Sequence, residues 1–285
     1  MSEERLIIRR AFDREFYFDS YGVRVKVESD LQELLDEAKQ AVIAGFGDCA
    51  VFFENVSGNQ ESGHVFGITF DGTHYFLFKN GAQISYGKSK KIFFKYLSGI
   101  LRIDVAEYAD SKVFLHAGVV GWKGMAIVMP AKSFQGKSTL TAELVRIGAD
   151  YYSDDYAVLD ERGYVHPFPR KLSMRYFGAT RGKEVSVEEL GGKYGREPIP
   201  VGMVLLTGFE KGAVWDPLVL SPGNGIMEII PHTIPIRRKS EFSLKVLDLV
   251  ASRAIIVKSA RGDSKKFAKF LLAFFDNHTN LVKMT

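Results

Sequence analysis

The chain has 285 residues, of which 46% are hydrophobic and 25% are charged. This composition is that of a globular protein and excludes a disordered or collagen-like chain. The length suits two ordinary domains or one large one. The formal net charge of +4 is too small to indicate a nucleic-acid-binding protein, so we expect no nucleic-acid partner.

The expected location is the cytoplasm. Cys49 is the only cysteine, so no disulfide can form within the chain, as is typical of a reducing compartment. Residues 1–10 contain no apolar signal core, and no apolar run approaches the roughly 18 residues that a membrane-spanning helix needs. We therefore expect no membrane partner.

The N-terminal third has the pattern of a small α+β domain, which we place at residues 1–108. Two runs around the turn at 20–22 predict a hairpin, the second of them alternating apolar and basic residues. Asp30 is a candidate N-cap, with Glu33 at the capping-box position, for a helix that extends to Gly45. Four short aromatic strands and a second helix are expected to follow, at 50–53, 65–70, 74–79, 83–86 and 89–103.

The remaining residues, 109–285, are expected to form an α/β domain. Two apolar runs predict strands at 112–120 and 125–129, and helical spacing predicts a helix at 137–147. A further strand at 151–159 completes a β-loop-α-β unit, whose parallel crossover would place this strand beside 125–129. Three more strands and two helices are expected at 201–206, 212–219, 226–230, 240–252 and 264–275.

The loop between the strand at 125–129 and the following helix resembles a phosphate-binding loop, G-x-x-x-x-G-K-[ST]. Backbone N–H groups of such a loop, at a helix N-terminus, surround phosphate oxygens; a lysine reaches the β- and γ-phosphates, and a hydroxyl binds Mg²⁺. An alanine stands where the pattern has its first glycine. The residues expected to bind nucleotide are Ala131, Lys132, Ser133, Phe134, Gln135, Gly136, Lys137, Ser138 and Thr139.

The chain contains a second Gly-Lys-Ser sequence at residues 87–89, also with an alanine five positions before its glycine. Spacing alone therefore does not separate the two copies. Only the copy at 131–139 follows a strand of the buried type and opens an amphipathic helix in the predicted order of elements, so we assign phosphate binding to that copy.

Acidic and basic residues beyond the loop are further candidates. Asp154 and Asp155 follow on the next strand, where one carboxylate could hold Mg²⁺ and the other could accept a proton, provided that the strand bends or ends there. A solvated turn is the alternative interpretation.

His116 lies in an apolar strand, where a lone histidine is usually a hydrogen-bonded core residue. A basic stretch with Arg170 and Arg175 could neutralise phosphate or form a solvated face.

Taken together, these segments resemble the HPr kinase-related proteins, relatives of HPr kinase/phosphorylase whose core is similar to phosphoenolpyruvate carboxykinase. The likeness rests on five segments, at 116–120, 131–139, 148–160, 165–169 and 172–175. It implies a phosphate-loop core with a mixed sheet, preceded by the smaller α+β domain. It also implies ATP bound at Ala131–Thr139, Mg²⁺ near Ser138 and an aspartate, and a catalytic aspartate close to His116.

The expected activity is ATP-dependent transfer of the γ-phosphate to a serine-type hydroxyl of a protein, peptide or small molecule. Lys137 and Mg²⁺ would neutralise the phosphates, and Ser138 and Asp154 would hold the metal. Asp155 would be the base, oriented by His116, although the two aspartates could exchange roles, and Arg175 would contact phosphate or acceptor. A non-catalytic nucleotide-binding scaffold and a phosphate-loop ATPase are the alternatives, and a homo-oligomer is compatible with the sequence.

Overall fold

The computed structural model describes residues 12–53, 62–131, 136–174 and 183–282. The chain divides into two compact units, Met1–Val105 and Ala106–Thr285. Each unit combines sheet and helix, so the fold is mixed α/β. The assignment of independent domains at 1–108 and 109–285 stays a prediction. Of the helices within the described ranges, none is both long enough and apolar enough to cross a membrane.

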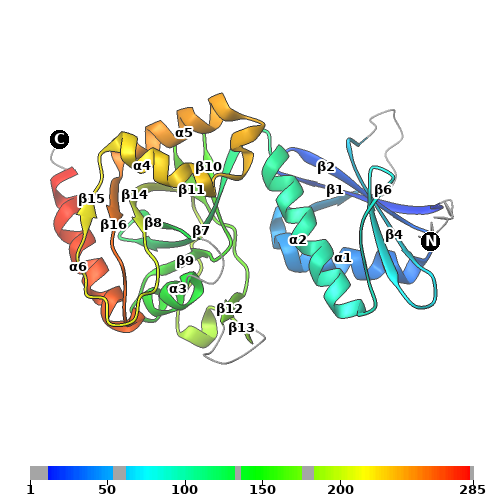
Figure 1. The fold of residues 1–285 in the computed structure, drawn as a ribbon, viewed down its shortest axis with the longest axis horizontal. Helices are drawn as coiled ribbons and strands as arrows, with labels where there is room; N and C mark the ends of the chain where they lie inside the picture. The colour runs from blue at the N-terminus through cyan, green and yellow to red at the C-terminus, as the bar shows by residue number, and fades with distance from the viewer. Residues whose placement is uncertain (1–11, 54–61, 132–135, 175–182, 283–285) are drawn as a thin grey trace, which may run out of the picture. The chain divides into compact units, whose positions relative to one another are not determined.

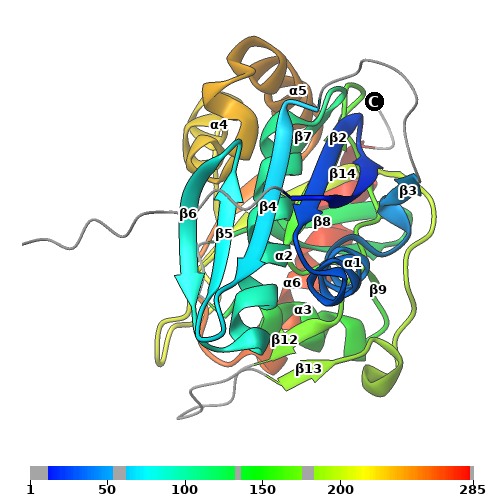
Figure 2. The same ribbon diagram turned by 90° about the vertical axis from the view of Figure 1, so that its right-hand side faces the viewer.

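The first unit contains a six-stranded sheet in the order β3-β1-β2-β4-β5-β6, and its two helices pack on one face (Figure 2). The predicted hairpin is confirmed, with Tyr21 and Gly22 in the turn at φ 50° and 81°. The elements of this unit are β1 (Arg14–Ser20), β2 (Val23–Ser29), α1 (Gln32–Phe46), β3 (Val51–Phe53), β4 (His64–Phe70), β5 (Tyr75–Lys79), β6 (Ala82–Gly87) and α2 (Lys90–Tyr108), which continues past Val105.

The prediction of Asp30 as an N-cap is wrong. The N-cap residue of α1 is Leu31, which makes no side-chain capping bond. The Asp30 carboxylate instead accepts a hydrogen bond of 2.9 Å from the Thr69 hydroxyl on β4. The aspartate therefore joins two segments of the unit, a contact that the local capping pattern does not reveal.

The second unit is built on an eight-stranded sheet in the order β11-β10-β7-β8-β14-β16-β15, with β9 paired to β7 and β11 paired also to β14 (Figure 1). A separate two-stranded sheet joins β12 and β13. The elements are β7 (Lys112–Trp122), β8 (Met125–Pro130), α3 (Lys137–Arg146), β9 (Asp150–Ser153), β10 (Tyr156–Asp160), β11 (Tyr164–His166), β12 (Leu172–Met174), β13 (Lys183–Val185), β14 (Ile199–Leu206), β15 (Leu218–Val219), α4 (Pro222–Ile229), α5 (Ser240–Arg253), β16 (Ile255–Lys258) and α6 (Ser264–Val282).

Helices cover both faces of the central strands, which explains why these strands are apolar in nearly every position. On β8, Ile127 and Met129 pack in the cluster that contains α3 and α6. The alternate residues Ala126 and Val128 pack in the opposite cluster, with α4 and α5. The strands β8, β14 and β16 run parallel, so their carboxyl ends meet at one edge of the sheet.

The expected crossover needs a correction, because β9 does not lie beside β8. The long strand β7 lies between them and pairs antiparallel with both. The predicted strand at 151–159 is also interrupted at Asp154 and Asp155, which separate β9 from β10. Both parts pair with β7. The chain thus bends at the acidic pair, as the sequence requires if both carboxylates are to serve one site.

Of two other predicted strands, the one at 226–230 is wrong and the one at 212–219 is only partly formed. Residues 226–230 belong mainly to the helix α4, because the Ser221 hydroxyl caps its N-terminus and Pro222 occupies its first turn. Of the predicted strand at 212–219, only Leu218 and Val219 pair, with β16.

Candidate phosphate-binding site

The predicted phosphate loop leaves the carboxyl end of β8 and enters α3. Gly136 is the N-cap of α3 and has the left-handed φ of 76°, a conformation that favours glycine. Ala131 is buried, and its N–H donates to the carbonyl of His116 at 3.4 Å. Lys137, Ser138 and Thr139 form the first turn of the helix. Lys132, Ser133, Phe134 and Gln135 lie outside the described residues.

Lys137 extends from this turn toward the acidic pair. Burial lowers the pKa of the Lys137 ammonium, while the nearby charges of Asp154 and Asp155 act in the opposite direction. Gly118 on β7 leaves room for the lysine. A Cβ atom at Gly118 would lie 3.0 Å from Cγ of Lys137 and 2.8 Å from the Thr141 hydroxyl. A side chain on Gly118 would therefore displace the lysine stem or the helix.

Asp154 is buried directly beside this lysine. Its side chain is 6% exposed, and burial raises its pKa to about 7, although a hydrogen bond with Ser138 and the charge of Lys137 lower it. Its Oδ1 atom is buried without a hydrogen-bond partner among the described residues. A buried carboxylate oxygen of this kind, next to a serine hydroxyl, fits a hard cation such as Mg²⁺.

The described residues contain no cluster of three or more His, Cys, Asp or Glu side chains that could enclose a metal. Such a cluster is not expected for Mg²⁺ in a nucleotide site. This ion usually keeps several waters and takes one or two protein ligands together with phosphate oxygens. Ser138 and Asp154 are the two residues here with oxygen atoms that could serve as such ligands.

Asp155 is more exposed than Asp154 and forms an ion pair with Arg170. Its backbone carbonyl accepts a hydrogen bond of 3.2 Å from the N–H of Ala117. His116, the residue before Ala117, faces Tyr156 across the β7–β10 pairing, with ring centroids 6.2 Å apart. Adjacent residues of β7 therefore bond to both parts of the site, the His116 carbonyl to Ala131 at the start of the loop and the Ala117 N–H to Asp155. Arg175 lies outside the described residues.

Arg261 is a site residue that the sequence did not indicate. Its side chain is 1% exposed, and burial lowers its pKa to about 10. Its Nη1 donates to the Ser264 hydroxyl at 2.5 Å, and its guanidinium lies against Gly136 at the N-terminus of α3. A cation near this N-terminus adds to the attraction for an anion there. No local pattern signals this, because the β16–α6 loop meets the phosphate loop only in the folded chain.

The second Gly-Lys-Ser copy, at residues 87–89, also lies between a strand and a helix. It follows β6 and precedes α2, so it too opens a helix. The difference lies in the surroundings. Most residues of β6 are exposed, and Lys88 is exposed and makes no ion pair with a described residue. Only the first copy places its lysine beside two carboxylates.

Comparison with known proteins adds no assignment: no protein-family model matches the chain, and a search of curated proteins finds no match. The site therefore has to be judged on its own chemistry. It can bind phosphate at a helix N-terminus, neutralise it with Lys137, hold a divalent cation through Ser138 and Asp154, and offer a carboxylate, Asp155, to a hydroxyl proton.

Proposed function

We propose that the chain is an ATP-dependent kinase, similar to the HPr kinase-related proteins, that phosphorylates a serine-type hydroxyl of a protein, peptide or small molecule. The observation that carries the proposal is the convergence of Lys137, Ser138, Asp154 and Asp155 at the N-terminus of α3. Phosphoryl transfer needs positive charge around the phosphates, a metal site and a group that orients the hydroxyl, and these residues supply all three. The single cysteine is consistent with a cytoplasmic enzyme.

In the proposed mechanism, the backbone N–H groups at the start of α3 and the ammonium of Lys137 bind the β- and γ-phosphates. Asp155 accepts a hydrogen bond from the acceptor hydroxyl and takes its proton late in the transfer. The ion pair with Arg170 orients this carboxylate, and His116, which pairs with the next residue, Tyr156, would orient it from the neighbouring strand. When bound, Mg²⁺ would supply charge neutralisation, and Ser138 and Asp154 would hold it.

The decisive experiment separates nucleotide binding from turnover. ATP binding is measured by calorimetry with and without Mg²⁺, and ADP release and transfer of labelled γ-phosphate are measured with and without serine-containing acceptors. A kinase binds ATP and transfers phosphate only to an acceptor. Hydrolysis without an acceptor would indicate an ATPase, and binding without any turnover would indicate a scaffold. Absence of ATP binding would overturn the proposal.

A further inference from the structure

Residues 167–174, which follow β11 and which we call the anchored segment, pass beside the acidic pair and are fixed on both sides of Arg170. Before Arg170, Phe168 is 2% exposed, and its N–H donates to the Tyr152 carbonyl at 3.1 Å. After Arg170, Leu172 and Met174 are buried in the cluster that contains α3. The backbone around Arg170 is therefore held by β9 on one side and by the core beneath α3 on the other.

The anchored segment contacts both carboxylates of the acidic pair. The Arg170 guanidinium forms an ion pair with Asp155, and the backbone N–H of Ser173 donates to the side chain of Asp154. The carbonyl of Arg170 accepts a hydrogen bond of 2.6 Å from the hydroxyl of Tyr151, a buried residue. The backbone of Arg170 is thus fixed, and its side chain is the part that can move without unpacking the segment.

The ion pair between Arg170 and Asp155 lies where the site meets solvent. The Arg170 side chain is 24% exposed and that of Asp155 is 35% exposed, whereas Asp154 is buried. Water competes with a partly exposed ion pair, so such a pair is weak. A bound molecule that offers other partners can therefore displace the guanidinium while the anchored segment keeps its place.

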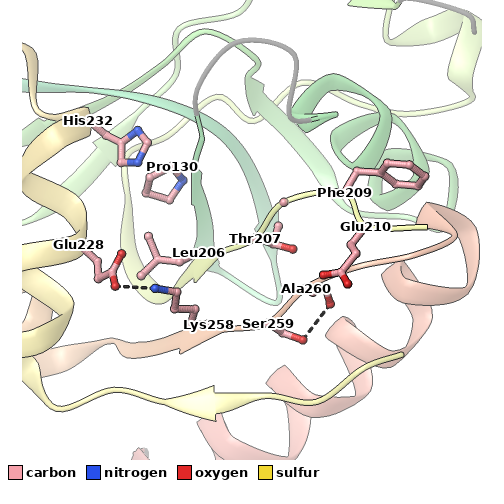
Figure 3. Close-up of a pocket in the computed structure, with 11 residues that line it drawn as sticks. Pro130, Leu206, Thr207, Phe209, Glu210, Glu228, His232, Lys258, Ser259 and Ala260 are labelled. Carbon is pink, nitrogen blue, oxygen red and sulfur yellow. Dashed lines mark hydrogen bonds and ion pairs between the residues drawn. The ribbon is translucent and has the colours of Figure 1, made fainter. Parts of the chain in front are cut away.

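The cavity that opens at the carboxyl ends of β8, β14 and β16 is separate from this ion pair (Figure 3). It has a volume of about 370 Å³, and Leu206, Glu228 and Lys258 are among the residues that line it. Neither aspartate of the acidic pair belongs to its lining. The side chain that meets the exposed carboxylate of Asp155 is therefore Arg170 and not a part of the cavity wall.

Water is the competitor that a kinase of this kind has to exclude. It is smaller than any acceptor and enters every space that a serine hydroxyl can reach, and a carboxylate that takes a proton from a hydroxyl can also take one from water. Enzymes exclude such a competitor when the binding energy of the correct substrate completes the site. The position of Arg170 suits this role, because its ion pair neutralises Asp155 and occupies the Oδ2 atom.

We propose that Arg170 is a gate on Asp155. The ion pair holds the carboxylate while the site is empty or contains ATP alone, and the binding of an acceptor displaces the guanidinium, so that the acceptor hydroxyl donates to Asp155 in its place. Water at the same position lacks the binding energy to displace it. This inference rests on the proposed function, and it adds the positioning residue that distinguishes an acceptor from water.

The test measures the hydrolysis of ATP in the absence of any acceptor. In this reaction the water oxygen bonds to the γ-phosphorus, the bond to ADP breaks, and a water proton passes to Asp155. Release of ADP is followed for the unsubstituted chain, Arg170→Gln and Arg170→Lys. We expect Arg170→Gln to hydrolyse ATP about 10- to 100-fold faster, with a KM for ATP that changes less than about twofold. Arg170→Lys retains a cation beside Asp155, so its rate should stay within about fivefold of the unsubstituted rate.

Two further variants separate the gate from other effects. Arg170→Gln combined with Asp155→Asn should return hydrolysis to the unsubstituted rate or below it, because the added turnover passes through Asp155. Arg162→Gln is the matched control, since Arg162 pairs at 3.2 Å with another aspartate, Asp160, at the opposite end of β10 from the acidic pair. Arg162→Gln should hydrolyse ATP at the unsubstituted rate.

The outcomes distinguish this inference from the proposed function. If calorimetry shows that the unsubstituted chain does not bind ATP, the proposed function fails and the gate fails with it. If the chain binds ATP and Arg170→Gln hydrolyses it at an equal or lower rate, only the gate is overturned, because Arg170 then does not restrain Asp155. An increase that persists in the double variant, or that is as large in Arg170→Lys as in Arg170→Gln, would also overturn the gate.

Discussion

The guanidinium group of Arg261 lies in the space that a side chain on Gly136 would occupy. Gly136 is thus constrained twice, by its left-handed φ of 76° and by the arginine from the β16–α6 loop. This relationship ties the N-terminus of α3 to the carboxyl end of β16. It makes the glycine of the Gly-Lys-Ser sequence a packing residue as well as a turn residue.

Gly136→Ala should therefore destabilise the protein more than backbone strain alone does. The left-handed conformation costs an alanine roughly 1–2 kcal/mol, and displacement of buried Arg261 should add about 1–3 kcal/mol to the loss of unfolding free energy. Gly212→Ala is the control, because Gly212 has φ 83° and a Cβ atom added to it would meet nothing within 4 Å among the described residues. Urea unfolding of both variants measures the difference. Equal losses would show that Arg261 moves aside without cost.

Lys137→Met should abolish most phosphate-dependent binding while leaving the fold stable. Burial lowers the pKa of Lys137 because it disfavours the charged ammonium, so the variant with an apolar side chain at this position should remain folded in the absence of urea. Affinity for ATP should fall at least about tenfold, because charge-assisted bonds to phosphate are lost. Lys88→Met in the second copy is the control, and calorimetry should show no change for it. Comparable losses in the two variants would contradict our choice of copy.

Asp154 should make the stability of the ligand-free protein depend on pH. Its pKa is about 7 in the folded chain and about 4 in an unfolded chain. The folded state therefore binds more protons between these values, and stability falls as the pH rises from about 4 to about 7. Asp154→Asn removes this dependence. We compare the unfolding free energy of Asp154→Asn with that of the unsubstituted chain at pH 5 and at pH 8. From pH 5 to pH 8, this difference should shift in favour of the variant by on the order of 1–3 kcal/mol.

Urea unfolding at the two pH values checks this expectation. Asp150→Asn is the control, since Asp150 is exposed on the same strand, and it should leave the pH dependence unchanged. An Asp154→Asn variant with the same pH dependence as the unsubstituted chain would show that another group titrates in this window.

Mg²⁺ should strengthen ATP binding through Ser138 and Asp154. Ser138→Ala and Asp154→Asn each remove one oxygen ligand or its charge, so the factor by which Mg²⁺ increases affinity should fall about 3- to 30-fold in either variant. Affinity in the presence of a chelator provides the internal reference. If Mg²⁺ strengthens ATP binding equally in the variants and in the unsubstituted chain, the metal lies elsewhere.

Asp155→Asn should separate binding from transfer. The substitution keeps the shape and removes the charge, so ATP affinity should stay near normal while transfer of labelled γ-phosphate to a serine acceptor falls by at least about 10². A greater loss of Mg²⁺-dependent binding in Asp155→Asn than in Asp154→Asn would exchange the roles of the two aspartates. Unchanged transfer in both variants and in the double variant would exclude an aspartate mechanism.

The elements that the sequence predicted correctly are those whose signals are local. The β1–β2 hairpin follows from alternation and from a turn that accepts positive φ at Tyr21 and Gly22. The predicted start of α6 at residue 264 is also correct, and the carboxylate of the preceding Asp263 accepts a bond of 2.8 Å from the N–H of Lys266. Residues 226–230 were assigned incorrectly because a short apolar run suits a strand or a buried helix equally well.

For the site, the sequence supplied the residue types on which the proposed chemistry depends: a lysine and a hydroxyl after a glycine, and two adjacent carboxylates after the following helix. The neighbours of these residues could be known only from the folded chain. Folding places β7 between β8 and β9, so that Gly118 makes room for Lys137, and it brings Arg261 to Gly136. Such contacts depend on which faces of the sheet the distant segments bury, because strand order and helix placement minimise exposed apolar surface over the whole chain. No spacing within a single segment encodes that choice.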